Sequence, residues 1–348
     1  MAELWFWLVA LMIAIYAALD GFDFGAGLLH FAVARNDSER RQSLAAIGPY
    51  WDGNEVWLIA SGGALFLAFP KVLAASFSGF YLAVFLIVWL LILRGISIEF
   101  RSHLQDPLWR RFWDVGFCVA SFALPFLLGA ALGNVLRGVP LDEEGWFALP
   151  LFDSWSPHGA LGLLDSYTLA IGGFAVLVIA LHGANYLCWK TDGDVARRAR
   201  LAAGPLWIVA TLAWIGVTRL TFSVNPAMAE HLAERPIAKL LLLSTLAAWL
   251  TVGFALLRRK ELLAFAASAL WILALLATTA ACVFPVLLRS VSAHHPSLSL
   301  TNAASSDFGL RIALRWWLVG APLAVGYFAL LARLHRGKVS AAVDGEGS

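Results

Sequence analysis

Long runs of apolar residues, separated by short charged segments, dominate the pattern of this 348-residue chain. A transmembrane helix needs about 20 predominantly apolar residues, and the pattern predicts nine such stretches. The predicted spans cover residues 4–34, 54–70, 72–100, 114–136, 161–188, 203–223, 237–257, 262–288 and 311–333. We therefore expect an all-α integral membrane protein with nine transmembrane helices, arranged as two four-helix bundles plus one peripheral helix.

The composition excludes a soluble domain of this size. Hydrophobic residues make up 60% of the chain and charged residues only 14%. The basic residues lie in short loops rather than in one continuous patch, so we expect no nucleic-acid partner. Residues 1–336 are predicted to form a single transmembrane helical domain, and residues 337–348 a disordered cytoplasmic tail.

The loops predict the orientation. Most Arg and Lys residues follow the first, third, fifth and seventh spans, whereas the opposite loops are longer and more acidic. Basic residues concentrate in cytoplasmic loops. An odd number of spans places the termini on opposite sides, so we expect the N-terminus outside and the C-terminus in the cytoplasm.

Two aspartates interrupt the first span. Asp20 and Asp23 are three residues apart and so share one helix face. Counting about 1.5 Å per residue from Trp5 and Trp7 places them past the midplane, in the cytoplasmic half of the bilayer. An ionised acid at the centre of a membrane helix costs about 2.5–3.5 kcal/mol on insertion scales. We therefore expect the pair to face protein and to be paired, hydrated or protonated.

The third span supplies a candidate counter-charge. Arg94 lies about two turns inside its cytoplasmic end, with Glu99 and Arg101 nearer the surface, and Asp114 begins the fourth span on the same side. A buried network of this kind is typical of a proton or ion path. For Glu99, Arg101 and Asp114 a second interpretation stays open, in which each is a helix-end charge that snorkels to water.

The segment from Pro49 to Leu58 places polar groups at the mouth of the second span. It contains Trp51, Asp52, Asn54, Glu55 and Trp57. Acids in the first turn of a helix lie against the positive end of its dipole. This arrangement predicts an entrance for a proton or a cation.

Redox chemistry within the chain has little support. The three cysteines form no CxxC pair, and of eight histidines only His30 and His182 lie well within spans. Membrane haem proteins usually show pairs of axial ligands on helices. We therefore expect no metal site and no cofactor bound by this chain alone, and His182 is the weak haem candidate to test first.

The densest motifs occur in residues 18–116. They are Asp20-Gly-Phe-Asp23-Phe-Gly25, the segments 35–41 and 49–58, Ser78-Gly-Phe-Tyr81, Arg94 and Phe100-Arg101-Ser102. Together these residues resemble subunit II of the cytochrome bd-type quinol oxidases.

The resemblance implies a heterodimer in the bacterial cytoplasmic membrane, with a larger subunit I that carries two b haems, haem d and the quinol-oxidising loop. The complex reduces O2 to water, and the chain alone is expected to be inactive. The resemblance also allows a small single-span accessory subunit, membrane lipids and a structural quinone or lipid.

The resemblance matches Asp52 to an acid on the path that leads protons from the cytoplasm to the oxygen site. We expect the proton pathway to comprise Asp52, Glu55, Asp20, Asp23, Arg94 and Glu99. Structural or assembly roles are expected for Trp51, Asn54, Trp57, Arg101 and Asp114.

Two alternatives stay open. A stand-alone proton-coupled transporter would use similar acids, although that class often shows interrupted helices around a central polar site. In the second alternative, the chain is mainly a scaffold that stabilises the haem subunit.

Overall fold

The computed structural model describes residues 1–341, which form helices α1 to α12 and one short β-hairpin. The elements are α1 (Ala2–Val33), α2 (Asp37–Ile47), α3 (Trp51–Ala68), α4 (Pro70–Gly79), α5 (Tyr81–Phe100), α6 (Pro107–Arg137), α7 (Ser166–Lys190), α8 (Gly193–Val224), α9 (Pro226–Glu234), α10 (Pro236–Leu257), α11 (Glu261–Val283), β1 (Val286–Leu288), β2 (Leu298–Ser299) and α12 (Asp307–Leu334).

Within residues 1–341, eight helices are long and apolar enough to cross a membrane, namely α1, α5, α6, α7, α8, α10, α11 and α12. The number rises to nine when α3 and α4 are counted as one span, although the chain bends by 119° between them. This agrees with the predicted all-α membrane fold. The chain is a multi-pass membrane protein.

The spans form two groups around the central helices α1 and α7. In the first group α1 packs against α3 and α6, and α5 packs against α6; in the second, α7 packs against α8 and α11, and α10 against α11. The groups meet where α7 contacts α1 and α6. Gly25 of α1 and Gly183 of α7 let the two backbones touch, because a Cβ at either position would collide with the other helix.

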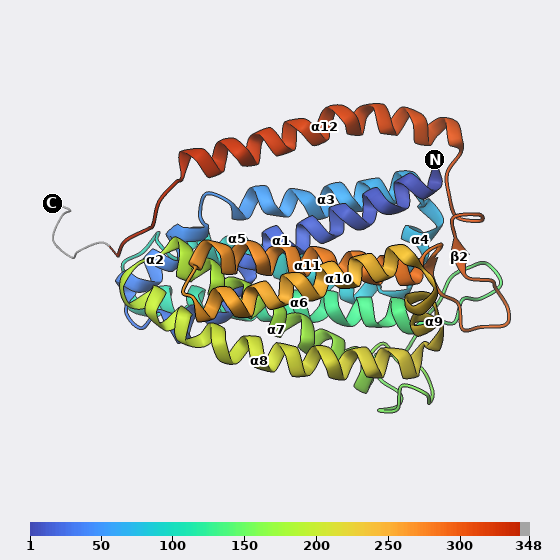
Figure 1. The fold of residues 1–348 in the computed structure, drawn as a ribbon, viewed down its shortest axis with the longest axis horizontal. Helices are drawn as coiled ribbons and strands as arrows, with labels where there is room; N and C mark the ends of the chain where they lie inside the picture. Colours follow the sequence, from blue (N-terminus) through green and yellow to red (C-terminus); the bar gives the residue numbers. More distant parts are fainter. Residues whose placement is uncertain (342–348) are drawn as a thin grey trace.

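The two ends of the bundle differ in character (Figure 1). We call the end that holds α2 and the turns 101–106, 191–192 and 258–260 the basic end, because most of the arginines and lysines gather there. The loop end holds the N-terminus, α4, α9, the loop 138–165 and the β-hairpin. The N-terminus and residue 341 therefore lie at opposite ends.

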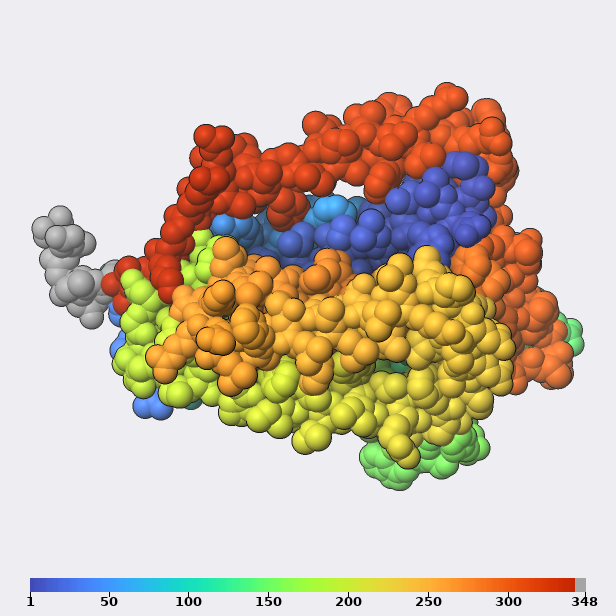
Figure 2. Space-filling view, viewed as in Figure 1, coloured from blue at the N-terminus to red at the C-terminus, as the bar shows by residue number. Residues whose placement is uncertain are grey.

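Helix α12 is peripheral, as predicted. It runs along the outside of the bundle and stands apart from the helices beside it over part of its length (Figure 2). At the loop end Trp5 Nε1 donates to the Leu310 carbonyl over 3.0 Å, and at the basic end Lys190 donates to the His335 carbonyl. Between these contacts, the Trp57 ring of α3 lies 6.3 Å from that of Phe328.

Two predicted spans have the wrong bounds. The stretch 72–100 is not one helix, because α4 ends at Gly79 and α5 begins at Tyr81. The stretch 262–288 also ends too late, since α11 stops at Val283 and residues 286–288 form β1. Both stretches are continuously apolar, so hydropathy alone gives no signal of the turn inside them.

Residues 338 and 339 of the predicted tail contact the basic end. The Val339 amide donates to the Lys190 carbonyl over 2.7 Å, and the Gln42 side chain donates to the Val339 carbonyl over 2.7 Å. Lys338 forms an ion pair with Glu261 over 2.7 Å. These bonds tie the segment to the basic end. The remainder of the predicted tail, residues 342–348, lies outside the described residues.

Candidate functional site

The centre of the site is the side chain of Arg94 on α5. Its Nη1 donates to Asp20 Oδ1 over 2.5 Å, and its Nη2 donates to Glu55 Oε1 over 2.5 Å. The guanidinium also lies 4.5 Å from the ring centroid of Phe24, in a cation–π contact. Arg94 and Asp20 are fully buried. One arginine therefore joins α1, α3 and α5 inside the first group of helices.

Asp23 is held by a neighbour from α3. The Asn54 amide nitrogen donates to Asp23 Oδ2 over 2.7 Å and to the Leu19 carbonyl over 3.1 Å. Both side chains are fully buried. Asn54 and Glu55 are consecutive residues near the start of α3, so this part of α3 contacts both aspartates of α1, directly or through Arg94. We call Asp20, Asp23, Asn54, Glu55 and Arg94 the acidic network.

The acidic network is partly exposed where α3 contributes to it. Glu55 is 22% exposed, whereas its partner Arg94 is fully buried. Asp52 lies three residues before Glu55, on the same face of α3, and is exposed. Within residues 1–341 the Asp52 side chain has no hydrogen bond or ion pair. Asp52 and Glu55 are therefore the exposed and the partly exposed acids next to the buried aspartates.

Several polar atoms of this region are buried without a hydrogen-bond partner inside the described chain. They are Asp23 Oδ1, Asn54 Oδ1 and Arg94 Nε. Buried polar groups in native proteins are nearly always satisfied by protein or by ordered water. A group of such atoms around two acids has the chemistry to bind water or an exchangeable proton.

The charges of the acidic network do not balance. Three carboxylates, those of Asp20, Asp23 and Glu55, face one guanidinium. A charge buried in an apolar medium without a partner is very unfavourable. Asp20 and Asp23 are fully buried and Arg94 is the one guanidinium beside them, so charge on both aspartates at once is unfavourable. The arrangement favours proton binding.

A second cluster lies at the basic end, around the Asp114 carboxylate of α6. Three side chains donate to it, and the donors are His30 Nε2 at 2.8 Å, Arg101 Nε at 2.6 Å and Arg40 Nη1 at 3.3 Å. The side chains of Asp114 and His30 are fully buried. We call these four residues the Asp114 cluster. It joins α1, α2 and α6 to the end of α5.

Helix α2 is fixed by two further acids. Asp37 accepts hydrogen bonds from Arg101 and Arg110, each over 2.8 Å, and Glu39 accepts one from Arg198 over 2.7 Å. The hydrogen bond from Arg198 lowers the pKa of Glu39. Partial burial on its own would raise the pKa of Asp37, but the hydrogen bond and charge of Arg101 lower it below its usual value.

The predicted site residues fall into three places. Asp20, Asp23, Asn54, Glu55 and Arg94 come together in the acidic network, with Asp52 at its entrance. Arg101 and Asp114 belong to the Asp114 cluster instead. Trp51 lies against Gly95 of α5, where a Cβ would be 3.3 Å from its ring, and Trp57 faces α12.

Glu99 does not join the acidic network, contrary to expectation. Its side chain is exposed, and it makes no side-chain contact with Arg94. Five residues along a helix turn through about 140° relative to the starting face, so Glu99 and Arg94 point to different sides of α5. The reading of Glu99 as a helix-end charge in water fits this position.

His182, the weak haem candidate, uses both ring nitrogens. Its Nε2 donates to the Ala18 carbonyl over 2.9 Å, and its Nδ1 lies 2.7 Å from Ser268 Oγ. Its ring stacks on Phe265 at 5.0 Å. Neither nitrogen is left for an axial bond, so a haem does not fit here. Among residues 1–341, no group of three or more His, Cys, Asp or Glu side chains is placed to hold a metal ion.

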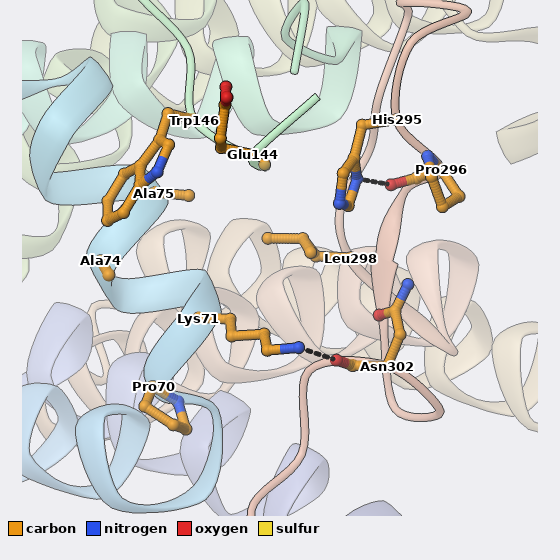
Figure 3. A pocket seen from close by; sticks show the side chains of 11 residues that line it. Pro70, Lys71, Ala74, Ala75, Glu144, Trp146, His295, Pro296, Leu298 and Asn302 are labelled. Atoms are coloured by element: carbon orange, nitrogen blue, oxygen red, sulfur yellow. Dashed lines mark hydrogen bonds between the residues drawn. The ribbon is translucent and has the colours of Figure 1, made fainter. Parts of the chain in front are cut away.

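A surface cavity of about 490 Å³ lies at the loop end, between α4 and the loops near residues 144–146 and 295–302 (Figure 3). Two of its polar side chains hydrogen-bond to other residues that line the cavity. Lys71 Nζ donates to the Asn302 carbonyl over 3.2 Å, and His295 Nδ1 lies 2.6 Å from the Pro296 carbonyl. Pro70, which lines it, begins α4 just after the end of α3 at Ala68, and Ala68 is 14 residues or about 21 Å along α3 from Asn54. The cavity is therefore separate from the acidic network.

Two residues of this region were not expected from the sequence. Tyr16 lies one turn before Asp20, and His30 two turns after Asp23, so both share the face of α1 that carries the aspartates. That heptad-like spacing was a signal in the sequence. A search of the apolar spans for charged residues alone does not detect this spacing, because neither Tyr16 nor His30 is a permanently charged residue.

The sequence is similar to those of known oxidase subunits. Residues 1–335 match the family model described as cytochrome bd terminal oxidase subunit II. The chain is 32% identical over 353 aligned residues to cytochrome bd-I ubiquinol oxidase subunit 2 of Escherichia coli, covering 94% of this chain and 92% of the relative. It is 30% identical over 334 residues to cytochrome bd ubiquinol oxidase subunit 2 of Bacillus subtilis, covering 93% and 92%.

The fold is also similar to a solved one. A chain of the bd oxidase from Geobacillus thermodenitrificans superimposes with a TM-score of 0.75 at 18% identity, over 96% of this chain and 98% of the other. This likeness concerns the fold. Together with the match over nearly the whole sequence, it leads to one conclusion: the chain belongs to the family of cytochrome bd terminal oxidase subunit II.

Proposed function

We propose that this chain conducts protons from the cytoplasm toward the oxygen-reducing site of a quinol oxidase. Membership of the family makes the chain one subunit of a quinol:oxygen oxidoreductase in the bacterial inner membrane, with a subunit I as its partner. The finer assignments concern its orientation, its pathway residues and the cofactors of the complex. The comparisons give no support to the transporter alternative.

One observation carries the proposal: a single arginine bridges a buried aspartate on α1 and a partly exposed glutamate on α3. Asp20, Arg94 and Glu55 are joined by two bonds of 2.5 Å each. Asp52, in water, collects protons and Glu55 takes them up. Asp20 and Asp23 then hold them inside the bundle, where Arg94 limits the unfavourable charge.

The orientation follows from the charge pattern. Positive residues concentrate on the cytoplasmic side of membrane proteins, so the basic end faces the cytoplasm and the N-terminus faces outward. The entrance at Asp52 then opens to the cytoplasm.

The cofactors of the complex belong to subunit I in this proposal. They are two b haems and haem d, which would transfer electrons from quinol to O2. His182, the haem candidate of this chain, uses both ring nitrogens within the protein, which supports this assignment. A small single-span accessory subunit, membrane lipids and a structural quinone or lipid complete the proposed set of partners.

Quinol oxidase turnover of the purified complex tests the pathway. We expect Asp52→Asn and Glu55→Gln to slow turnover by about a hundredfold, the lower end of the range for a lost proton-transfer group. The reduced-minus-oxidised haem spectrum should stay unchanged, because neither substitution alters the shape of the side chain.

Glu99→Gln is the matched control. Glu99 is also an acid at the basic end, but it lies outside the acidic network. Its substitution should leave turnover unchanged. If Glu55→Gln and Asp52→Asn both retain full turnover, these two acids are not on the pathway; if both lose haem together with activity, their role is in assembly.

A further inference from the structure

One face of α1 carries a line of polar or unusually small residues. The line comprises Tyr16, Asp20, Asp23, Gly27 and His30, at successive steps of four, three, four and three residues. Such spacing keeps all five on one stripe of a helix. The stripe extends from the acidic network to the Asp114 cluster, and it connects two sites that the proposed function treats separately.

The middle of the stripe is filled from α6. Gly27 has no side chain, and a Cβ there would collide with Ser121 Oγ. The hydroxyl of Ser121 therefore occupies the position on the stripe between Asp23 and His30. Cys118, one turn earlier on α6, donates to the Gly27 carbonyl over 3.1 Å and holds the two helices together at this point.

Three consecutive groups on this line have an unused polar atom. Asp23 Oδ1, Ser121 Oγ and His30 Nδ1 are all buried and without a hydrogen-bond partner in the described chain. The side chains of Asp23, Ser121 and His30 are fully buried. Unsatisfied buried polar atoms are rare in native proteins, and three along one line indicate a shared proton or water chain.

His30 is oriented for proton exchange at one nitrogen. Its Nε2 donates to Asp114 Oδ1 over 2.8 Å, which leaves Nδ1 as the free atom. The charged groups that face it are Asp114 from α6, Arg101 from the end of α5 and Arg40 from α2. A carboxylate bonded to one imidazole nitrogen fixes the tautomer and stabilises the imidazolium. The two arginines oppose that charge, so the imidazolium forms only transiently.

We propose that His30 is a proton-holding residue of the oxidase, coupled to Asp23 through the hydroxyl of Ser121. In this step the O–H bond of the Asp23 carboxyl breaks and an N–H bond forms at His30 Nδ1, with Ser121 passing the proton. Asp23 becomes a carboxylate and His30 an imidazolium, so charge is conserved. The step gives the acidic network an internal proton reserve beyond Asp20 and Asp23. It rests on the proposed function, since it requires protons in the acidic network.

The test uses His30→Gln in the intact oxidase complex. Glutamine keeps a nitrogen donor for Asp114 but does not titrate. We expect the pH profile of turnover to lose one inflection, because glutamine cannot change charge as imidazole does. The redox-induced infrared difference spectrum should also lose its imidazole bands. A merely structural role for His30 would change neither readout.

His182→Gln is the matched control, because His182 is equally buried but lies on α7, away from the stripe. Its pH profile should match that of the unmodified complex. Ser121→Ala removes only a hydroxyl and should lose the same inflection. If His30→Gln fails to assemble, this second variant still tests whether His30 is coupled to Asp23.

The outcomes separate the two proposals. If Glu55→Gln slows turnover while the His30 and Ser121 variants keep the normal pH profile, the proton reserve is excluded and the pathway stands. If Glu55→Gln has no effect but the inflection disappears in His30→Gln, the reserve is supported and the entrance through α3 is excluded.

Discussion

The guanidinium of Arg94 lies 2.5 Å from the Asp20 carboxylate, and neither side chain has any exposure to solvent. A pair this deeply buried gains strong attraction in a medium of low dielectric constant, but both charges lose their hydration. The pair is therefore sensitive to the loss of either partner. Because Asp20 is 13 residues from the end of α1, it lies about 20 Å from the basic end.

Removal of one member of this pair should destabilise the protein more than removal of both. Arg94→Gln leaves Asp20 buried without its counter-charge, which costs about 3–5 kcal/mol for a buried pair. We expect a lower yield of assembled complex and a lower Tm. Adding Asp20→Asn to Arg94→Gln should recover part of that loss.

The control for this pair is an exposed one. Arg311 and Asp307 form an ion pair over 2.8 Å with side chains that are 68% and 55% exposed. Exposed pairs contribute little to stability, so Arg311→Gln should leave the Tm unchanged. An Arg94→Gln complex as stable as the unmodified one would contradict the buried-pair account.

The close approach of α1 and α7 should not tolerate a methyl group. Gly25→Ala would place a Cβ against the backbone of Ile179 and Gly183. Backbone atoms cannot move aside as a flexible side chain can, so we expect loss of the assembled complex, measured by haem content per purified protein. Gly62→Ala on α3 should be tolerated, since no atom lies within 4 Å of a Cβ there. Equal yields for the two variants would show that the helices separate without penalty.

The attachment of α2 should weaken in acid. The pKa values of Asp37 and Glu39 are lowered in the folded protein, so their contribution to stability is fully present above the unfolded values of about 3.9 and 4.3. That contribution is lost as the pH falls through the lower, folded values. Thermal unfolding should therefore show a Tm that drops below about pH 4. In the double variant Asp37→Asn with Glu39→Gln this part of the pH dependence should be absent; an unchanged drop would assign it to other groups.

The sequence predicted that the charges of the first and third spans would lie together. A charged side chain inside an apolar span needs a polar or charged partner, so Asp20, Asp23 and Arg94 were expected to lie close together. In the structure Asp20 bonds directly to Arg94, and Asp23 lies beside them. Glu99 lies apart from Arg94 because the two residues point to different sides of α5, which depth in the membrane alone does not predict. The partners of Asp114 also depended on rotation, and they required the position of α2, which apolar patterning does not reveal.

The bounds of the helices could be predicted only where polarity changes. Helix α10 begins at Pro236 and ends at Leu257, within one residue of the expected span, because charged residues flank it. The turn between α4 and α5 lies inside an apolar stretch, where nothing in the hydropathy marks a change of direction. The bonds of Val339 to the basic end involve backbone atoms and so leave no signature in the side chains of the tail.

The most direct measurement of the central claim is proton uptake during a single turnover. The reduced oxidase, reconstituted in vesicles, is mixed with O2 while a pH-sensitive dye reports the compartment that faces the basic end. We predict that the unmodified complex takes up protons from this compartment and that Glu55→Gln delays the uptake while the haems are still oxidised by O2. Uptake by Glu55→Gln at the normal rate, with its haems intact, would contradict a proton path through Glu55, Arg94 and Asp20.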